Sequence, residues 1–127
     1  MEFKIDITVS PAVISDTIVA AVEGGSGYWL NGFQLTWSEK IPTAACWYAD
    51  HDLCAGDFKI ACEFDDPESN DGAQGTKVIT PEDVKGGLEF MLRNHIRHFA
   101  DMMNENGDAI TADVFIQCVL FKDVIYG

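Results

Sequence analysis

Alternating apolar and polar residues at the beginning of the chain predict a β-strand over residues 2–9. The apolar positions are Phe3, Ile5, Ile7 and Val9, and the polar positions between them are Glu2, Lys4, Asp6 and Thr8. A period of two is typical of a strand with one buried face. Ser10 and Pro11 then predict a helix start, because serine caps helices and proline fits the first helical position. An apolar stripe at helical spacing follows, and Gly24 and Gly25 end it.

The middle of the chain is rich in aromatic residues and predicts several strands. Asn31–Gly32 lies among aromatic and β-favouring residues, a pattern typical of a tight hairpin turn. Trp47–Tyr48 predicts a short strand, and the alternating residues of 58–64 predict a longer one whose apolar face includes Cys62. Residues 65–76 are rich in Asp, Ser, Asn and Gly and predict a loop, followed by a short strand at 77–79.

Helix signals dominate the last third of the chain. Thr80–Pro81 predicts a helix start, and apolar residues continue at helical spacing to about Met103. Gly86–Gly87 weakens its first turns by about 1 kcal/mol per glycine. The apolar run 112–121 fits a buried helix or a buried strand, and its length and start signals favour a helix. The sequence therefore predicts an α+β fold: a small antiparallel sheet with two to three helices packed on one face.

Charge narrows the range of partners. The 127 residues carry 21 acidic and eight basic side chains, a formal net charge of -13. Many of the acids lie between residues 50 and 71, with Lys59 as the base among them: Asp50, Asp52, Asp57, Glu63, Asp65, Asp66, Glu68 and Asp71. Such a surface repels nucleic acid and anionic membranes and attracts basic protein surfaces. With 47% hydrophobic and 11% aromatic residues, the chain is expected to fold as a single domain, residues 1–127, rather than stay disordered.

The cysteines raise the question of disulfides or a metal. The first residues lack the apolar core of a secretory signal, and no apolar run reaches the roughly 18 residues of a membrane helix. Cys46, Cys54, Cys62 and Cys118 are therefore expected to be reduced thiols in a cytoplasmic protein.

Cys46, His51, Cys54 and Cys62 are the nearest approach to a zinc motif, since thiolates and imidazole suit zinc. Their spacing lacks a tight cysteine pair, so ordinary core or loop cysteines are favoured, and no metal or other cofactor is expected.

His95, His98 and Asp101 are spaced three apart, which would place them on one face of the predicted long helix. Such a group could bind a metal or transfer protons. His95 also lies on the apolar stripe, which favours a partly buried structural histidine.

Two regions of the chain carry a resemblance. One includes Glu23-Gly24-Gly25-Ser26-Gly27-Tyr28-Trp29, and the other includes Thr111-Ala112-Asp113-Val114-Phe115-Ile116-Gln117 with Tyr126-Gly127. Together they resemble a family of small uncharacterised proteins of tailed bacteriophages. The resemblance implies a phage origin and a location in the host cell cytoplasm. It implies no catalytic residue, because the family has no agreed activity.

Charge and resemblance together predict a non-enzymatic phage accessory protein that binds a basic host protein surface. An inhibitor of host defence, of the anti-CRISPR or DNA-mimic type, fits because carboxylates can compete with DNA for a basic channel. The acidic stretch would form the contact, with Tyr28, Trp29 and Trp47 as aromatic anchors.

Other interpretations stay open at the level of sequence. The acids could serve only solubility. The cysteine and histidine residues could form a metal-binding module or a metal-dependent enzyme, and a phage structural or assembly component is a further class. A homodimer is also predicted, because a domain this small cannot cover every aromatic residue in its middle. Trp37 and Trp47 would lie at that interface, away from the acidic loop, since two such loops repel each other.

Overall fold

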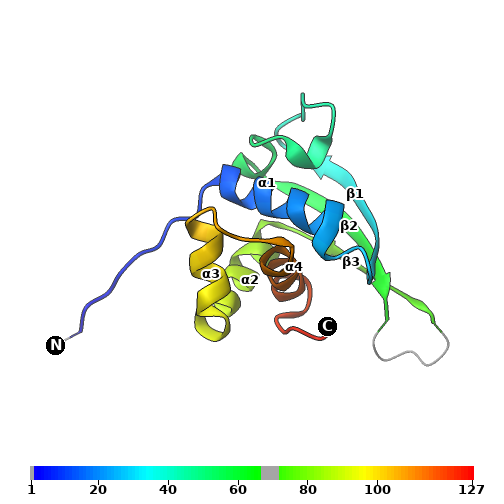
Figure 1. Cartoon of the computed structure of the whole chain (residues 1–127). Coiled ribbons are helices and arrows are strands. Elements are labelled where there is room, and N and C mark those ends of the chain that lie inside the picture. The colour runs from blue at the N-terminus through cyan, green and yellow to red at the C-terminus, as the bar shows by residue number, and fades with distance from the viewer. Residues whose placement is uncertain (1, 67–71) are drawn as a thin grey trace.

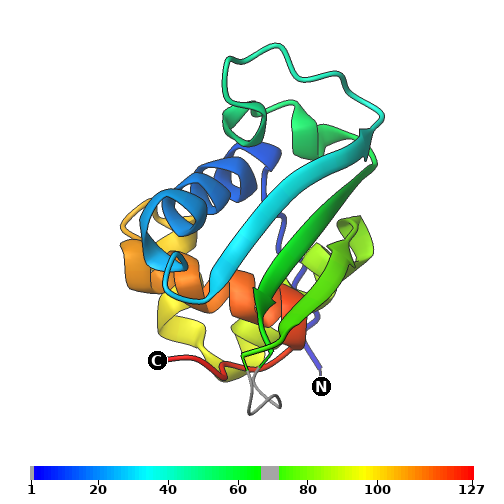
Figure 2. The ribbon, with the colours of Figure 1, turned by 90° about the vertical axis from the view of Figure 1, so that its right-hand side faces the viewer.

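Three antiparallel strands form a sheet in the order β1-β2-β3, and the helices all lie on one side of it (Figures 1 and 2). The computed structural model describes residues 2–66 and 72–127. The strands are β1 (Leu30–Ser38), β2 (Phe58–Asp65) and β3 (Gln74–Ile79), and the helices are α1 (Pro11–Ala20), α2 (Pro81–Asn94), α3 (Ile96–Met103) and α4 (Ala109–Phe121). A π-helical turn, η1 (Ala21–Gly25), extends α1, and two 3-10 turns, η2 (Trp47–Ala49) and η3 (Leu53–Ala55), precede β2. The predicted α+β fold is confirmed.

The central strand β2 separates the two faces of the sheet. Phe58, Ile60, Cys62 and Phe64 are buried against the helices, as their alternation predicted. Ile60 pairs with Leu35 of β1 and with Ile79 of β3, so the buried face continues across all three strands. No described helix covers the other face, on which Lys59, Glu63 and Asp65 of β2 are exposed.

Helix α4 is the core of the helical layer. Every residue from Thr111 to Leu120 is buried, which the almost wholly apolar sequence of this segment requires, and the predicted helix is confirmed. Helix α2 packs closely against it at Gly87. A Cβ atom at position 87 would lie 2.6 Å from the Cα of Val119, so the two helices approach at a distance that only glycine permits.

The predicted helix starts are confirmed by their caps. The Ser10 hydroxyl accepts a hydrogen bond of 3.2 Å from the Val13 N–H at the start of α1. Thr80 and Asp83 form a capping box at the start of α2, in which the Asp83 carboxylate accepts from the Thr80 N–H at 2.9 Å. Asp108 accepts from the Thr111 N–H at 2.9 Å and caps α4.

The prediction of a strand over residues 2–9 is wrong for the single chain. These residues form an extended arm outside the sheet, and Figure 1 shows the arm leading away from the body of the protein. Phe3 and Ile5 are each 83% exposed. A strand needs a neighbour for its backbone hydrogen bonds, and no described strand lies beside the arm.

Four other local predictions are wrong in whole or in part. Residues 74–76, predicted as loop, belong to β3. Asn31–Gly32 forms no hairpin but lies within β1, where Leu30 pairs with Phe64 and Gly32 with Glu63, so that Asn31 is the extra residue of a β-bulge. Trp47–Tyr48 belongs to the 3-10 turn η2 instead of a strand. The long helix breaks at His95, whose φ of -138° and ψ of 53° are not helical.

Candidate functional site

Asp50, the first acid of the predicted binding stretch, is buried and stabilises a turn. Its carboxylate accepts hydrogen bonds from the backbone N–H groups of Thr43 at 2.7 Å, Ala44 at 3.2 Å and Asp52 at 2.9 Å. These bonds, with that from Thr43 the strongest, hold the pKa of Asp50 below its usual value. Asp50 therefore stabilises the local fold, and its carboxylate is not free for a partner.

The other acids of the stretch that the structure describes do not form one cluster. Asp52 and Asp57 are exposed before β2, whereas Glu63 and Asp65 are exposed near its far end. Eight residues of extended chain between Asp57 and Asp65 span about 26 Å. Asp66 is half-buried. Glu68 and Asp71 lie outside the described residues, so their predicted contact with a partner has no structural account here.

Glu63 and Asp65 make one end of the uncovered sheet face acidic. The Glu63 side chain lies over Gly32, because a Cβ atom there would be 3.2 Å from a Glu63 carboxylate oxygen. The Asp65 carboxylate accepts hydrogen bonds from the side-chain amides of Asn31 at 2.7 Å and Gln74 at 3.4 Å. Within the part of the chain that the structure describes, neither acid forms an ion pair with lysine or arginine.

Trp37 and Val78 are exposed apolar side chains at the other end of the same face, where Lys59 is also exposed. Trp37 is 49% exposed and Val78 is 48% exposed. Trp37 pairs with Lys59 of β2, and Val78 pairs with Ala61, so the two side chains flank the central strand. The predicted site did not include Val78 or Trp37, although Trp37 was expected at a dimer interface. The available signal was the alternation along β2, in which every second residue points away from the core: Lys59, Ala61, Glu63 and Asp65.

Trp29 is the clearest correction among the predicted aromatic anchors. It is only 1% exposed, its ring stacks on Tyr126 at a centroid distance of 4.8 Å, and it belongs to the core. Trp47 is half-buried and stacks on Phe33 at 5.4 Å. Tyr28 is exposed over half of its surface, but its hydroxyl is already engaged. Trp29 therefore cannot anchor a partner, and the other two contribute only their exposed parts.

The buried carboxylate of Asp113 brings residues 26–29 and helix α4 together. It accepts hydrogen bonds from the Ser26 hydroxyl at 2.8 Å, the Tyr28 hydroxyl at 2.6 Å, the Trp29 indole N–H at 2.7 Å and the Gln117 amide at 3.1 Å. All four donors are neutral. Burial, together with the bond to Asp113, raises the pKa of Tyr28 to about 12, so this hydroxyl stays protonated and donates at neutral pH.

Gln117 extends this network to the last residues of the sequence. Its side-chain oxygen accepts from the backbone N–H groups of Ile125 and Tyr126 at 2.8 and 2.9 Å, and its amide donates to the Tyr126 carbonyl. Sequence reasoning missed Asp113, because three of its four hydrogen-bond donors, Ser26, Tyr28 and Trp29, lie more than 80 residues away. An acid inside the apolar run 112–121 was the available signal. The Asp113 carboxylate accepts hydrogen bonds from four neutral donors and has no basic partner among the described residues. Its role is therefore to stabilise the fold.

The possible zinc ligands do not come together. Among residues 2–66 and 72–127, no three His, Cys, Asp or Glu side chains are placed to share a metal ion. His51 instead lies 2.8 Å from Asp16. Burial raises the pKa of Cys54 to about 11 and that of Cys62 to about 12, which keeps both thiols protonated at neutral pH.

The predicted face of His95, His98 and Asp101 is lost where the helix breaks. His95 ends α2, whereas His98 and Asp101 belong to α3. The His98 ring nitrogen Nδ1 lies 2.8 Å from the Thr111 hydroxyl and links α3 to α4. His98 therefore has a structural partner, and His95 is half-buried, as its place on the apolar stripe predicted.

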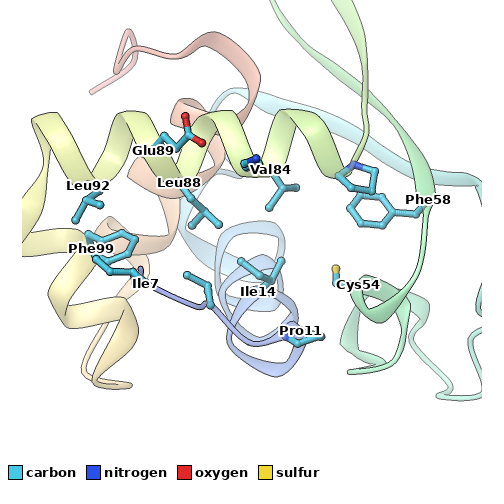
Figure 3. A pocket seen from close by; sticks show the side chains of 13 residues that line it. Ile7, Pro11, Ile14, Cys54, Phe58, Val84, Leu88, Glu89, Leu92 and Phe99 are labelled. Atoms are coloured by element: carbon cyan, nitrogen blue, oxygen red, sulfur yellow. The ribbon is translucent and has the colours of Figure 1, made fainter. Parts of the chain in front are cut away.

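An apolar groove of about 330 Å³ runs between the arm and α2 (Figure 3). Ile7 lies at one end near Leu92 and Phe99, and Phe58 lies at the other. Glu89 and Lys85 lie at its edge and supply its charged groups. The rest of its lining is apolar apart from the Cys54 thiol, so the groove offers mainly a hydrophobic contact surface.

Comparison of the chain with known protein families, with curated proteins and with solved structures finds no match. None of the helices in the described parts of the chain is long and apolar enough to cross a membrane.

Proposed function

We propose that this protein is a non-enzymatic phage accessory protein that binds a basic surface of a host protein. The class of partner is a nucleic-acid-binding defence effector, which the protein inhibits as an anti-CRISPR or a DNA mimic would. The uncovered face of the sheet is the contact surface in this proposal, and it replaces the longer acidic stretch as the core of the site.

The observation that carries the proposal is the arrangement of this face, with two acids at one end and two exposed apolar side chains beside Lys59 at the other. Glu63 and Asp65 occupy one end without a described basic partner, and Trp37 and Val78 occupy the other. A partner with a basic rim beside an apolar pocket would complement both ends. Charge would speed association and select the partner, while a half-exposed tryptophan supplies the large apolar contact typical of a binding hot spot.

The net charge of -13 supports a basic partner rather than a nucleic acid or an anionic membrane. Basic channels of defence effectors carry the arginine and lysine residues that normally contact phosphates. Carboxylates on a rigid sheet would occupy such a channel without any sequence readout. The resemblance to phage proteins supports a host protein as the target.

The test is capture of host proteins on the immobilised protein at low and at high salt, with partners identified by mass spectrometry. We expect a basic nucleic-acid-binding protein that is released by salt. Glu63→Gln with Asp65→Asn should abolish its capture, and Trp37→Ala should weaken it. The matched control is Asp101→Asn with Glu105→Gln, which removes the same charge outside the sheet and should retain the partner. No salt-sensitive partner, or equal capture by both double variants, would refute the proposal.

A further inference from the structure

The arm, residues 2–9, has the sequence of a strand but no strand beside it in the described chain. Its apolar positions Phe3 and Ile5 are each 83% exposed, and Ile7 is 49% exposed. Three large apolar side chains in a row on a projecting segment are costly to leave in water. The apolar side chains of the arm therefore need a partner that covers them, and the described part of the single chain does not supply one.

The base of the arm shows which way its apolar face turns. Val9 packs against the core, and both Ile7 and Val9 line the apolar groove beside α2. Figure 3 places Ile7 beside Phe99 and Leu92. Ile7 and Val9 therefore face the groove where the arm joins the body. In a regular strand, Phe3 and Ile5 would continue the same face beyond it.

We propose that two copies of this chain associate by pairing their arms as an antiparallel ribbon centred on Ile5. In this register Ile5 faces Ile5 of the second copy and Phe3 faces Ile7. Lys4 faces Asp6, and the twofold symmetry forms this opposite-charge pair twice. Cross-strand pairs of opposite charge and of apolar residues stabilise antiparallel strands.

Charge selects this register over its neighbours. A shift that keeps the apolar face together moves the pairing by two residues. One such shift places Lys4 opposite Lys4, and the other places Asp6 opposite Asp6. Both bring like charges directly together, which destabilises a strand pair. The sequence of the arm is thus self-complementary in one antiparallel register.

The groove provides the contact that a bare ribbon lacks. A two-stranded ribbon is marginally stable alone, and packing against helices is what usually stabilises it. Phe3 of the second copy, opposite Ile7, would face the groove at Leu92 and Phe99, and the symmetric contact forms on the other copy. This interface uses neither the acidic end of the sheet nor Trp37, so it is independent of the proposed function.

The first test is the mass of the full chain in solution by light scattering at micromolar concentration. We expect about twice the monomer mass of 14.0 kDa. Ile5→Lys should give the monomer mass with an unchanged circular dichroism spectrum, because position 5 is exposed in the single chain. Ile41→Lys is the matched control, since Ile41 is 82% exposed but far from the arm in sequence, and it should remain a dimer. A monomeric wild type, or a dimer that survives Ile5→Lys, overturns the proposal.

A charge exchange tests the register. Lys4→Asp and Asp6→Lys should each dissociate the dimer, because each places two like-charged pairs across the ribbon. The double variant restores both opposite-charge pairs and should restore the dimer mass. Failure of the double variant to restore it overturns the antiparallel register. Dissociation by Trp37→Glu but not by Ile5→Lys would also overturn the proposal and place the interface on the sheet face.

Discussion

The indole N–H of Trp29 donates a hydrogen bond of 2.7 Å to the carboxylate of Asp113, which lies 84 residues further along the chain. The same carboxylate oxygen accepts from the Ser26 hydroxyl at 2.8 Å. Both donors are buried, so Asp113 satisfies groups that water cannot reach. The bond therefore joins the residues before β1 to the middle of α4.

Replacing Asp113 by alanine should lower the free energy of unfolding by about 3 kcal/mol, because Ser26 and Trp29 would be left buried without an acceptor. Urea denaturation followed by tryptophan fluorescence measures this change. Asp113→Asn keeps one acceptor oxygen and should cost less. Asp101→Ala, on the exposed side of α3, should cost about 0.5 kcal/mol or less. Equal losses for Asp113→Ala and Asp101→Ala would contradict the role given to the network.

The neighbouring glycines of α2 should respond in opposite ways to alanine. Gly87→Ala should destabilise the protein by about 2 kcal/mol, because the added methyl group would press on the backbone of Val119 in α4. Gly86→Ala meets only the flexible end of Lys122, so helix propensity should make it neutral or stabilising by up to about 1 kcal/mol. The melting temperatures of the two variants, compared with that of the wild type, measure these effects. The same change in both would mean that Gly87 does not set the approach of the helices.

Asp50 should contribute to the acid sensitivity of the fold. Its pKa in the folded protein lies below the unfolded value of 3.8, so its stabilising effect is fully present above that value. The effect is lost as the pH falls through the lower folded pKa. Asp50→Asn should therefore lose less stability than the wild type between about pH 5 and about pH 2. The urea midpoints of the wild type and of Asp50→Asn, measured across this pH range, test the prediction. An equal fall of the midpoint with pH in the two proteins would contradict it.

Salt should stabilise the protein. With a net charge of -13, folding brings like charges closer, and added salt screens their repulsion. The melting temperature should rise between about 0.01 M and about 0.15 M sodium chloride, over which the screening length falls from about 30 Å to about 8 Å. Glu63→Gln with Asp65→Asn should show a smaller rise. A melting temperature that falls with salt would mean that favourable ion pairs outweigh the repulsion.

Local signals predicted those elements whose contacts are also local. The caps at Ser10, Thr80 and Asp108 each use an atom within three residues, so the sequence shows the donor and the acceptor together. The strand around Ile60 was predictable because its buried face repeats every second residue. Helix α4 was predictable from its length, although an apolar run alone fits a strand equally well.

The errors arose where a pattern has two structural outcomes. Asn31–Gly32 suits a hairpin turn and also a bulge, and pairing with β2 decides for the bulge. The arm has a strand pattern, but alternation does not reveal whether a neighbouring strand exists. The helix break at His95 leaves no mark on the apolar spacing. The hydrogen-bond network around Asp113 could not be predicted, because its donors Ser26, Tyr28 and Trp29 lie far away in the sequence.

The buried position of α4 has a consequence for biosynthesis. A ribosome makes α1 and all three strands before α4, yet α1 with its extension η1, and also β3, pack against that helix. Until α4 has been synthesised, the buried face of the sheet has no complete cover, and Trp29 lacks Asp113 as the acceptor for its N–H. The nascent chain would therefore expose a large apolar surface until α4 has been made. Chaperones are recruited under this condition. Folding of these elements then waits for α4.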